Sequence, residues 1–303
     1  MNAAAAAAAD NSPLRQIATS TSSGPTVLRI LLGAQLRRLR LAAGISREAA
    51  GKAIRGSHAK ISRLELGQVS FKQLDIADLL TLYGVRDPAE RDWFFTLMAQ
   101  ANSHGWWHSF ADLVPDWFEV YVGLEEAASV IRGYEVQFIP GLLQTEDYAR
   151  AVIRLGHPQC DDEEITRRVR LRTTRAELLR RPQPPTIWVV VDEAVLHRSL
   201  GGRVVMRAQI EHLLEVSKLP NVTIQVAPFD RGGHAAAGGP FTILRFTEPA
   251  LPDIVYLEQL TSATYLDKRE DLDNYTMVID RLSVEALSAV ETTDFLRDMV
   301  KDS

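Results

Sequence analysis

Basic and hydrogen-bonding side chains cluster in the first quarter of the chain. Arg63 can donate two hydrogen bonds to a guanine edge, His58 can donate or accept at a base edge, and Ser62 can contact either kind of edge weakly. Arg47 and Lys60 suit backbone phosphates, which set the register of a protein on DNA without carrying sequence. The candidate DNA-binding residues are Arg47, Ser57, His58, Ala59, Lys60, Ser62 and Arg63.

Two short helices that cross closely are needed to present these side chains. Ser46 and Ser57 are good N-caps, because a serine hydroxyl accepts the free amides of the next helical turn. The small residues at the crossing are Ala50, Gly51 and Ala53. The apolar seam that the two helices share is formed by Ile54, Ile61 and Leu64. The polar face of the second helix would then point into the major groove. Its free amides would favour a phosphate. The alternative is a helical bundle with a solvated basic face.

The apolar spacing predicts further helices and a second domain. In the first domain, helices are expected at residues 28–41, 47–54, 57–66, 72–83 and 87–102. In the second domain, helices are expected at 120–132, 145–155, 162–180, 204–218, 267–282 and 284–290, and strands at 186–191, 222–227, 241–246 and 254–257. The expected fold class is α+β: an all-α helix-turn-helix bundle, then an α+β domain with a small antiparallel or mixed sheet covered by helices.

Four regions are expected along the chain. They are a disordered N-terminal tail at 1–26, a helix-turn-helix DNA-binding domain at 27–86, a helical connector at 87–104 and an α+β regulatory or partner-binding domain at 105–303. Residues 27–84 hold ten basic and four acidic residues, a net charge of +6, whereas the whole chain carries −5 and the remainder therefore −11. A basic module on an acidic body can bind phosphate locally without coating DNA indiscriminately.

The string from Lys60 to Glu65, followed by Gly67, resembles the end of the recognition helix in Cro/repressor-type, or Xre, helix-turn-helix proteins. In that family an arginine of the first helix pairs with the glutamate at this ending. The resemblance therefore implies a structural pair between Arg40 and Glu65. The family often has glycine one position earlier in the turn, where this chain has Arg55. Either Gly56 or Arg55 must then take the positive φ angle.

The resemblance extends along most of the chain. The segments that carry it are Trp106-Trp107, Leu124-Glu125, Pro140–Glu146 with Tyr148–Arg150, Gly239–Phe241 and Val255–Glu258. They resemble a large actinobacterial group of Xre regulators with a C-terminal domain of unknown function. Some of these are antitoxin-like regulators of the Scr type, paired with a small companion protein. The resemblance implies control by a partner or a ligand, with an antitoxin-like interaction protein as the alternative function.

Enzymatic and metal chemistry in the second domain has weaker support. His104 and His108 are four residues apart and could lie on one helix face as metal ligands, but the tryptophans between them favour packing. His157 and Cys160 form a still weaker pair. Asp192, Glu193 and His197 could be acid-base residues, although capping of a helix by Asp192 is the simpler interpretation. No catalytic, cofactor-binding or metal-binding residues are therefore predicted, and the chain is not expected to be an enzyme.

Two turn-rich segments could line a site. The loop from Gly232 to Gly239 lacks the lysine and Ser/Thr of a phosphate loop and is expected to be a flexible hairpin connection, with a ligand-contact loop as the alternative. The segment from Pro140 to Thr145 is expected to be a connector before a helix, with a pocket wall or partner surface as the alternative.

The composition favours a cytoplasmic protein. The single cysteine cannot form an internal disulfide, which fits a reducing cytosol. No run approaches the roughly 18–20 apolar residues of a membrane span, and residues 3–9, which are all alanine, make a poor signal peptide. We expect a homodimeric regulator of double-stranded DNA, without a membrane partner. A small companion protein and a small-molecule effector are further candidate partners.

Overall fold

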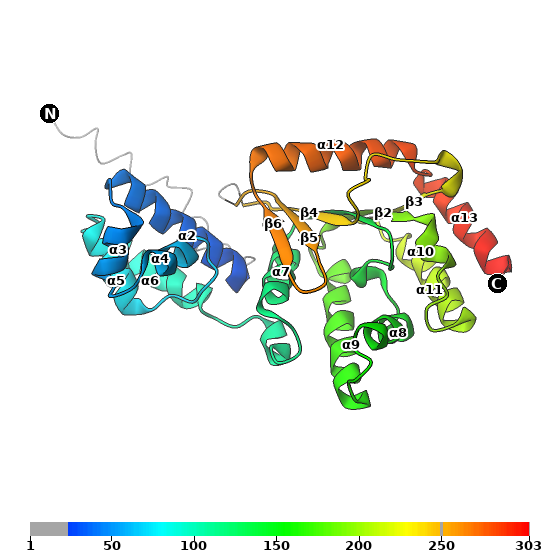
Figure 1. Ribbon diagram of the computed structural model, residues 1–303, viewed down its shortest axis with the longest axis horizontal. Coiled ribbons are helices and arrows are strands. Elements are labelled where there is room, and N and C mark those ends of the chain that lie inside the picture. Colours follow the sequence, from blue (N-terminus) through cyan, green and yellow to red (C-terminus); the bar gives the residue numbers. More distant parts are fainter. Residues whose placement is uncertain (1–23, 249–250, 303) are drawn as a thin grey trace. The chain divides into compact units, whose positions relative to one another are not determined.

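The computed structural model describes residues 24–248 and 251–302, which fold into two compact units. One unit holds the described residues up to Trp106 together with Glu248 and Leu251, and the other holds residues 107–247 and 252–302 (Figure 1). The expected tail at 1–26 lies outside the described residues, except for its last three. Of these, Pro25 and Thr26 begin the first helix.

Helices alone build the first unit within residues 24–106. They are α2 (Pro25–Ala42), α3 (Arg47–Ala53), α4 (His58–Glu65), α5 (Gln73–Leu82) and α6 (Pro88–Ala101). Helix α2 packs against α4 and α6, and α5 packs against α3 and α6. The core of the unit is formed by Leu32, Leu36, Ile61, Leu64, Ile76 and Phe94, all of which are almost fully buried.

A mixed sheet forms the centre of the second unit. Within residues 107–247 and 252–302 its strands are β1 (Val130–Glu135), β2 (Thr186–Asp192), β3 (Val222–Ala227), β4 (Phe241–Arg245), β5 (Ile254–Glu258) and β6 (Ala263–Leu266). Their order is β3-β2-β1-β4-β5-β6. The first three strands are parallel to one another, and β4, β5 and β6 continue the sheet in antiparallel pairs. The α+β fold class is thereby confirmed.

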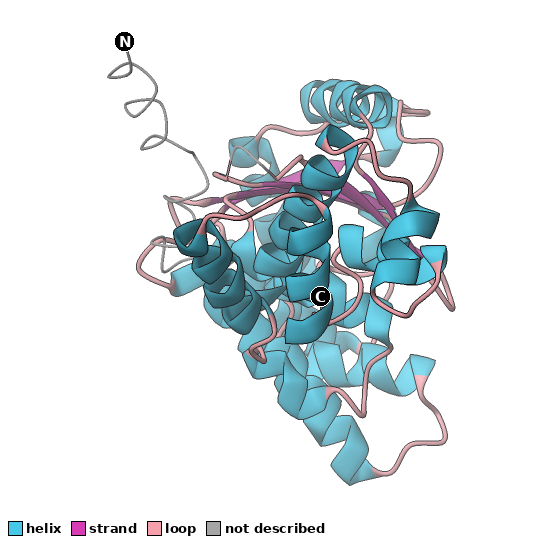
Figure 2. Ribbon diagram, turned by 90° about the vertical axis from the view of Figure 1, so that its left-hand side faces the viewer, coloured by secondary structure: helices cyan, strands magenta, loops and turns pink. Residues whose placement is uncertain are grey.

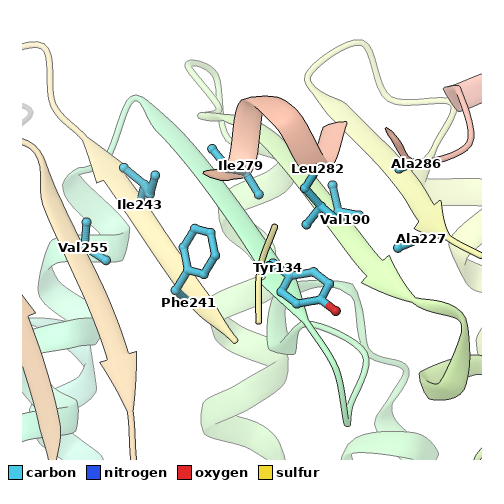
Figure 3. Close-up of a cluster of buried hydrophobic side chains, with 10 residues drawn as sticks. Tyr134, Val190, Ala227, Phe241, Ile243, Val255, Ile279, Leu282 and Ala286 are labelled. Carbon is cyan, nitrogen blue, oxygen red and sulfur yellow. The ribbon is translucent and has the colours of Figure 1, made fainter. Parts of the chain in front are cut away.

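Helices cover both faces of this sheet (Figures 1 and 2). Helix α12 (Arg269–Glu285) lies over one face, and α7 (Asp116–Ala127), α8 (Glu146–Gly156) and α9 (Asp162–Ala176) lie on the other. The remaining helices of the unit are α10 (Glu193–His197), α11 (Arg203–Val216) and α13 (Ala289–Asp302), with short 3-10 turns at Trp106–Phe110, Gly141–Leu143, Glu177–Arg180 and Phe229–Arg231. Ile279 and Leu282 of α12 pack onto Tyr134, Val190 and Phe241 of the sheet (Figure 3).

Three expectations for the second unit are wrong. Residues 130–132 belong to β1 and not to a helix, because pairing with β2 and β4 on both sides outweighs the local helical pattern. Residues 284–290 are not one helix, since α12 runs to Glu285 and α13 begins at Ala289. The loop after β3 is not a hairpin, because β2 and β1 lie between β3 and β4 in the sheet. Strand β6 was not anticipated.

Candidate DNA-binding surface

Two serine caps fix where the paired helices α3 and α4 begin. The Ser46 hydroxyl accepts a hydrogen bond from the Ala49 amide at 3.1 Å, and the Ser57 hydroxyl accepts one from the Lys60 amide at 3.3 Å. Both caps were expected from the sequence and are confirmed. Each satisfies one of the amides that a helix start leaves unpaired.

Two glycines let α4 approach its neighbours at backbone distance. A Cβ atom on Gly51 of α3 would lie 2.9 Å from the Ser57 carbonyl carbon, and one on Gly33 of α2 would lie 2.4 Å from the Leu64 carbonyl oxygen. Any side chain there would push the helices apart. The close approach at Gly51 was expected, whereas Gly33 was missed. A glycine inside a helical pattern is the signal that could have found it.

Arg55 takes the positive φ angle of the turn between α3 and α4. Its φ is +54°, whereas Gly56 does not adopt a left-handed conformation. This settles the alternative left open by the sequence, at a cost of roughly 1–2 kcal/mol for a residue with a Cβ. The Arg55 guanidinium also donates a hydrogen bond to the Asp78 carboxylate at 2.8 Å on the surface.

A buried ion pair anchors the end of α4 to α2. Nε of Arg40 lies 2.5 Å from Oε1 of Glu65 and Nη2 lies 3.1 Å from Oε2, while Nη1 donates to the Ile45 carbonyl at 2.8 Å. The hydrogen bond to Glu65 raises the pKa of the Arg40 guanidinium above its ordinary value. The pair that the family resemblance implied is therefore present. Glu65 is buried and does not lie on an exposed reading face.

The two candidate phosphate contacts both have acidic partners. Nε of Arg47 donates to Oε2 of Glu65 at 3.1 Å, and the Arg47 side chain remains 38% exposed. Nζ of Lys60 lies 2.6 Å from Oδ2 of Asp75, a buried residue of α5. These pairings were not expected. Each offsets part of the positive charge with which the side chain would attract a phosphate.

The remaining candidates gather on the outward side of α4. Ser57, His58, Ala59 and Arg63 are exposed, and Ser62 is half-buried. Residues three or four apart lie on one helix face, so His58 and Ser62, and Ala59 and Arg63, form two adjacent rows. The structure thus brings together the residues that were expected to meet base edges. Arg47 and Lys60 flank them through their contacts with Glu65 and Asp75.

Comparison with family models divides the chain as the two units do. Residues 31–94 match a helix-turn-helix domain model. Residues 118–298, more than half of the chain, match the model described as a domain of unknown function, DUF5753. The chain belongs to the DUF5753 family. In this DUF5753 protein, the helix-turn-helix match runs from within α2 to within α6, and the mixed sheet lies within the DUF5753 match. No curated protein and no solved structure matches the chain.

The alternative sites in the DUF5753 domain have structural partners. Asp192 caps α10 by accepting from the Ala194 amide at 2.9 Å, which confirms the capping interpretation. His197 pairs with Glu193 at 3.0 Å, and the Cys160 thiol donates to Glu164 at 3.0 Å. Within residues 24–248 and 251–302, no three His, Cys, Asp or Glu residues are grouped as metal ligands. None of the helices in this described part of the chain has the length and apolar character to span a bilayer.

Proposed function

We propose that this protein is a sequence-specific transcriptional regulator that inserts α4 into the major groove of DNA. The observation that carries the proposal is the exposure of Ser57, the N-cap of α4, and of His58, Ala59 and Arg63 on the helix itself, whose Ile61 and Leu64 are buried in the core. The match of residues 31–94 to a helix-turn-helix domain supports it. In this mode Arg63 forks onto a guanine, while His58 and Ser62 contact neighbouring base edges.

The proposed assembly is a cytoplasmic homodimer. Two-fold symmetry would present two α4 helices to half-sites about 34 Å apart, one turn of B-DNA. The DUF5753 domain would supply dimerisation and receive the regulatory input, either from a small-molecule effector or from a small companion protein. Catalysis has no role in this proposal, because the DNA-binding surface acts only by recognition.

Substitution of Arg63 tests base reading. A duplex selected by the protein from a random pool would serve as the specific site, and a scrambled duplex as the non-specific site. We expect Arg63→Ala to weaken specific binding by about 1–3 kcal/mol and to leave non-specific binding almost unchanged, because the lost contact reads sequence. Fluorescence anisotropy titrations at one fixed salt concentration measure both affinities.

Two comparison variants make the result interpretable. Lys60→Ala is expected to weaken both duplexes alike and to flatten the dependence on salt, because a phosphate contact is independent of sequence. Thermal unfolding of this variant is measured alongside, because the substitution also leaves the buried Asp75 without its cation. Arg207→Ala, which removes a half-exposed arginine of α11, is expected to change neither affinity. Equal losses on both duplexes for Arg63→Ala would remove Arg63 from base reading.

A further inference from the structure

A cavity of about 250 Å³ lies at the carboxyl end of β3 in the second unit. Its walls are Ala227 and Pro228 at the strand end, the loop from Arg231 to His234, Leu282 and Glu285 of α12, and Ala286, which follows the end of that helix. Figure 3 shows Leu282 on the helix above the sheet and Ala286 just past the end of this helix, with Ala227 at the end of β3 nearby. Ligands in open α/β sheets commonly bind outside the carboxyl ends of parallel strands.

The loop wall of this cavity is tied to the sheet. Oη of Tyr134, on β1, lies 2.8 Å from Nε2 of His234 and donates to Oδ2 of Asp192, on β2, at 3.2 Å. Nδ1 of His234 accepts from the Ala236 amide at 3.3 Å, so in the neutral ring Nε2 carries the proton and donates to Tyr134. Through Tyr134, His234 therefore ties the glycine-rich loop to two parallel strands, β1 and β2.

Two residues of opposite charge, Arg231 and Glu285, line the cavity. Arg231 is exposed at the loop side. On the helix side, the Glu285 side chain is 40% exposed, but its Oε2 is buried and has no hydrogen-bond partner among the described residues, while Oε1 lies 3.8 Å from Nη2 of Arg281. A buried carboxylate oxygen without a donor is unfavourable, and a cationic donor in the cavity would satisfy it. Leu282 and Ala286 add apolar surface to the lining of the cavity.

We propose that this cavity binds a small zwitterionic metabolite of the α-amino acid class. Its ammonium group donates to Glu285, its carboxylate pairs with Arg231, and its side chain lies against Leu282 and Ala286. One anion and one cation in a space of this size match a single amino acid. A mononucleotide brings two negative charges that Glu285 repels. This site is separate from α4, so it would give the regulator an effector input without using the DNA-binding surface.

Binding is tested on the full chain in the absence of DNA. Isothermal titration calorimetry with each of the common α-amino acids is expected to show one-to-one binding by at least one of them. Its N-acetyl derivative is expected to bind at least tenfold more weakly, because it lacks the ammonium group. Its methyl ester is expected to bind at least threefold more weakly, because it lacks the carboxylate. No binding by any amino acid at millimolar concentration, or tighter binding by a mononucleotide, would overturn the proposal.

Variants of the lining assign the two charges. Glu285→Gln is expected to weaken binding roughly ten- to hundredfold, because the amide oxygen can still accept a hydrogen bond but carries no negative charge to attract the ammonium group. Arg231→Ala is expected to abolish the preference for the free acid over the methyl ester. If Arg231 had only a structural role, its loss would weaken binding of the acid and of the ester alike. Ala286→Leu should block binding by filling the cavity while both charges remain. Glu215→Gln, on the exposed surface of α11, is the matched control and should bind as the unchanged protein does.

These outcomes are independent of DNA binding. Equal affinity of the amino acid for Glu285→Gln, Arg231→Ala and the unchanged chain would contradict the site even if DNA binding is normal. Conversely, loss of sequence preference in Arg63→Ala would support the proposed DNA contact whatever the cavity binds. Thermal unfolding of each variant separates a folding defect from a binding defect. If Glu285→Gln does not fold, the site can still be tested with Ala286→Leu and with the two ligand derivatives.

Discussion

Three charged side chains meet beneath the exposed face of α4. Glu65 accepts hydrogen bonds from Arg40 at 2.5 and 3.1 Å and from Arg47 at 3.1 Å, and both Glu65 and Arg40 are at least nine-tenths buried. Removing one partner of a buried pair leaves the other charge uncompensated in a low-dielectric environment. The position of α4 therefore depends on Glu65, although Glu65 itself is withdrawn from the surface.

We expect Glu65→Ala to lower the free energy of unfolding by about 3–5 kcal/mol, because Arg40 would remain buried without a partner. Urea denaturation followed by circular dichroism measures this. Asp294→Ala, which breaks an exposed pair with Arg297 on α13, serves as the control and should cost about 0–1 kcal/mol. A Glu65→Ala loss no larger than that of the control would contradict the anchoring role.

A second residue, Glu135 at the end of β1, makes stability depend on pH. Burial, with a smaller contribution from the charge of Glu258, raises the pKa of Glu135 from 4.5 to about 8, and Arg172 opposes this. Between about pH 4.5 and pH 8 the folded chain therefore holds a proton that the unfolded chain has released. The contribution of Glu135 to stability falls as pH rises through this window and is level above it.

Glu135→Gln is expected to remove this slope and to stabilise the protein at pH 8 to 9, because the amide needs no proton to stay neutral. Thermal unfolding at several values between pH 5 and pH 9 measures the effect. Glu177→Gln, on the exposed surface, should keep the slope of the unchanged protein. A parallel pH profile for Glu135→Gln would refute this assignment.

At the scale of elements, the crossing of α3 and α4 permits no side chain at Gly51. A Cβ there would meet backbone atoms of Ser57 and His58 at 2.9–3.1 Å, and backbone cannot move aside as a flexible side chain can. Gly156, in the last turn of α8, offers a contrast, since a Cβ on it would meet no atom within 4 Å and its φ is not positive.

We expect Gly51→Ala to destabilise the protein by about 1–3 kcal/mol through overpacking, and to weaken DNA binding by displacing α4. Gly156→Ala should be neutral or stabilise the protein by up to about 1 kcal/mol, because alanine favours the helix. Chemical denaturation of both variants gives the comparison. Similar effects of the two substitutions would argue against a close crossing at Gly51.

The sequence predicts elements that depend on local signals better than it predicts elements that depend on pairing with distant segments. The caps at Ser46 and Ser57 and the small residues between them are local, so α3 and α4 could be predicted within a residue or two. Strand β1 could not, because it owes its conformation to β2 and β4, far along the chain. The start of α13 could have been found, since Ser288 and Glu291 form a reciprocal capping box that the sequence displays.

The candidate site was predicted only in part for a related reason. Helical spacing identifies which residues share the outward face of α4, and His58, Ala59 and Arg63 are exposed there. It does not reveal which cations already have a partner from another helix. Lys60 meets Asp75 of α5, and Arg47 meets Glu65, through tertiary packing that spacing along one helix cannot show.

At the scale of the whole molecule, charge is divided unevenly along the chain. Residues 27–84 carry a net charge of +6 and the remainder −11. Only the first of the two units is thus suited to approach a polyanion, and the acidic remainder opposes binding to DNA that offers no specific contacts. A change of charge on the outward face of α4 should consequently alter the affinity for DNA more than the same change elsewhere in that unit.

The most direct measurement of this claim compares Ala59→Glu with Ala99→Glu. Both alanines are exposed in helices of the first unit, and both substitutions add one negative charge. We predict that, on the selected duplex, Ala59→Glu weakens binding at least a hundredfold by placing a carboxylate in the groove. Ala99→Glu, on α6, should stay within about threefold of the unchanged protein, as long-range charge effects are screened. Equal affinities of the two variants, with unchanged thermal stability, would contradict the account.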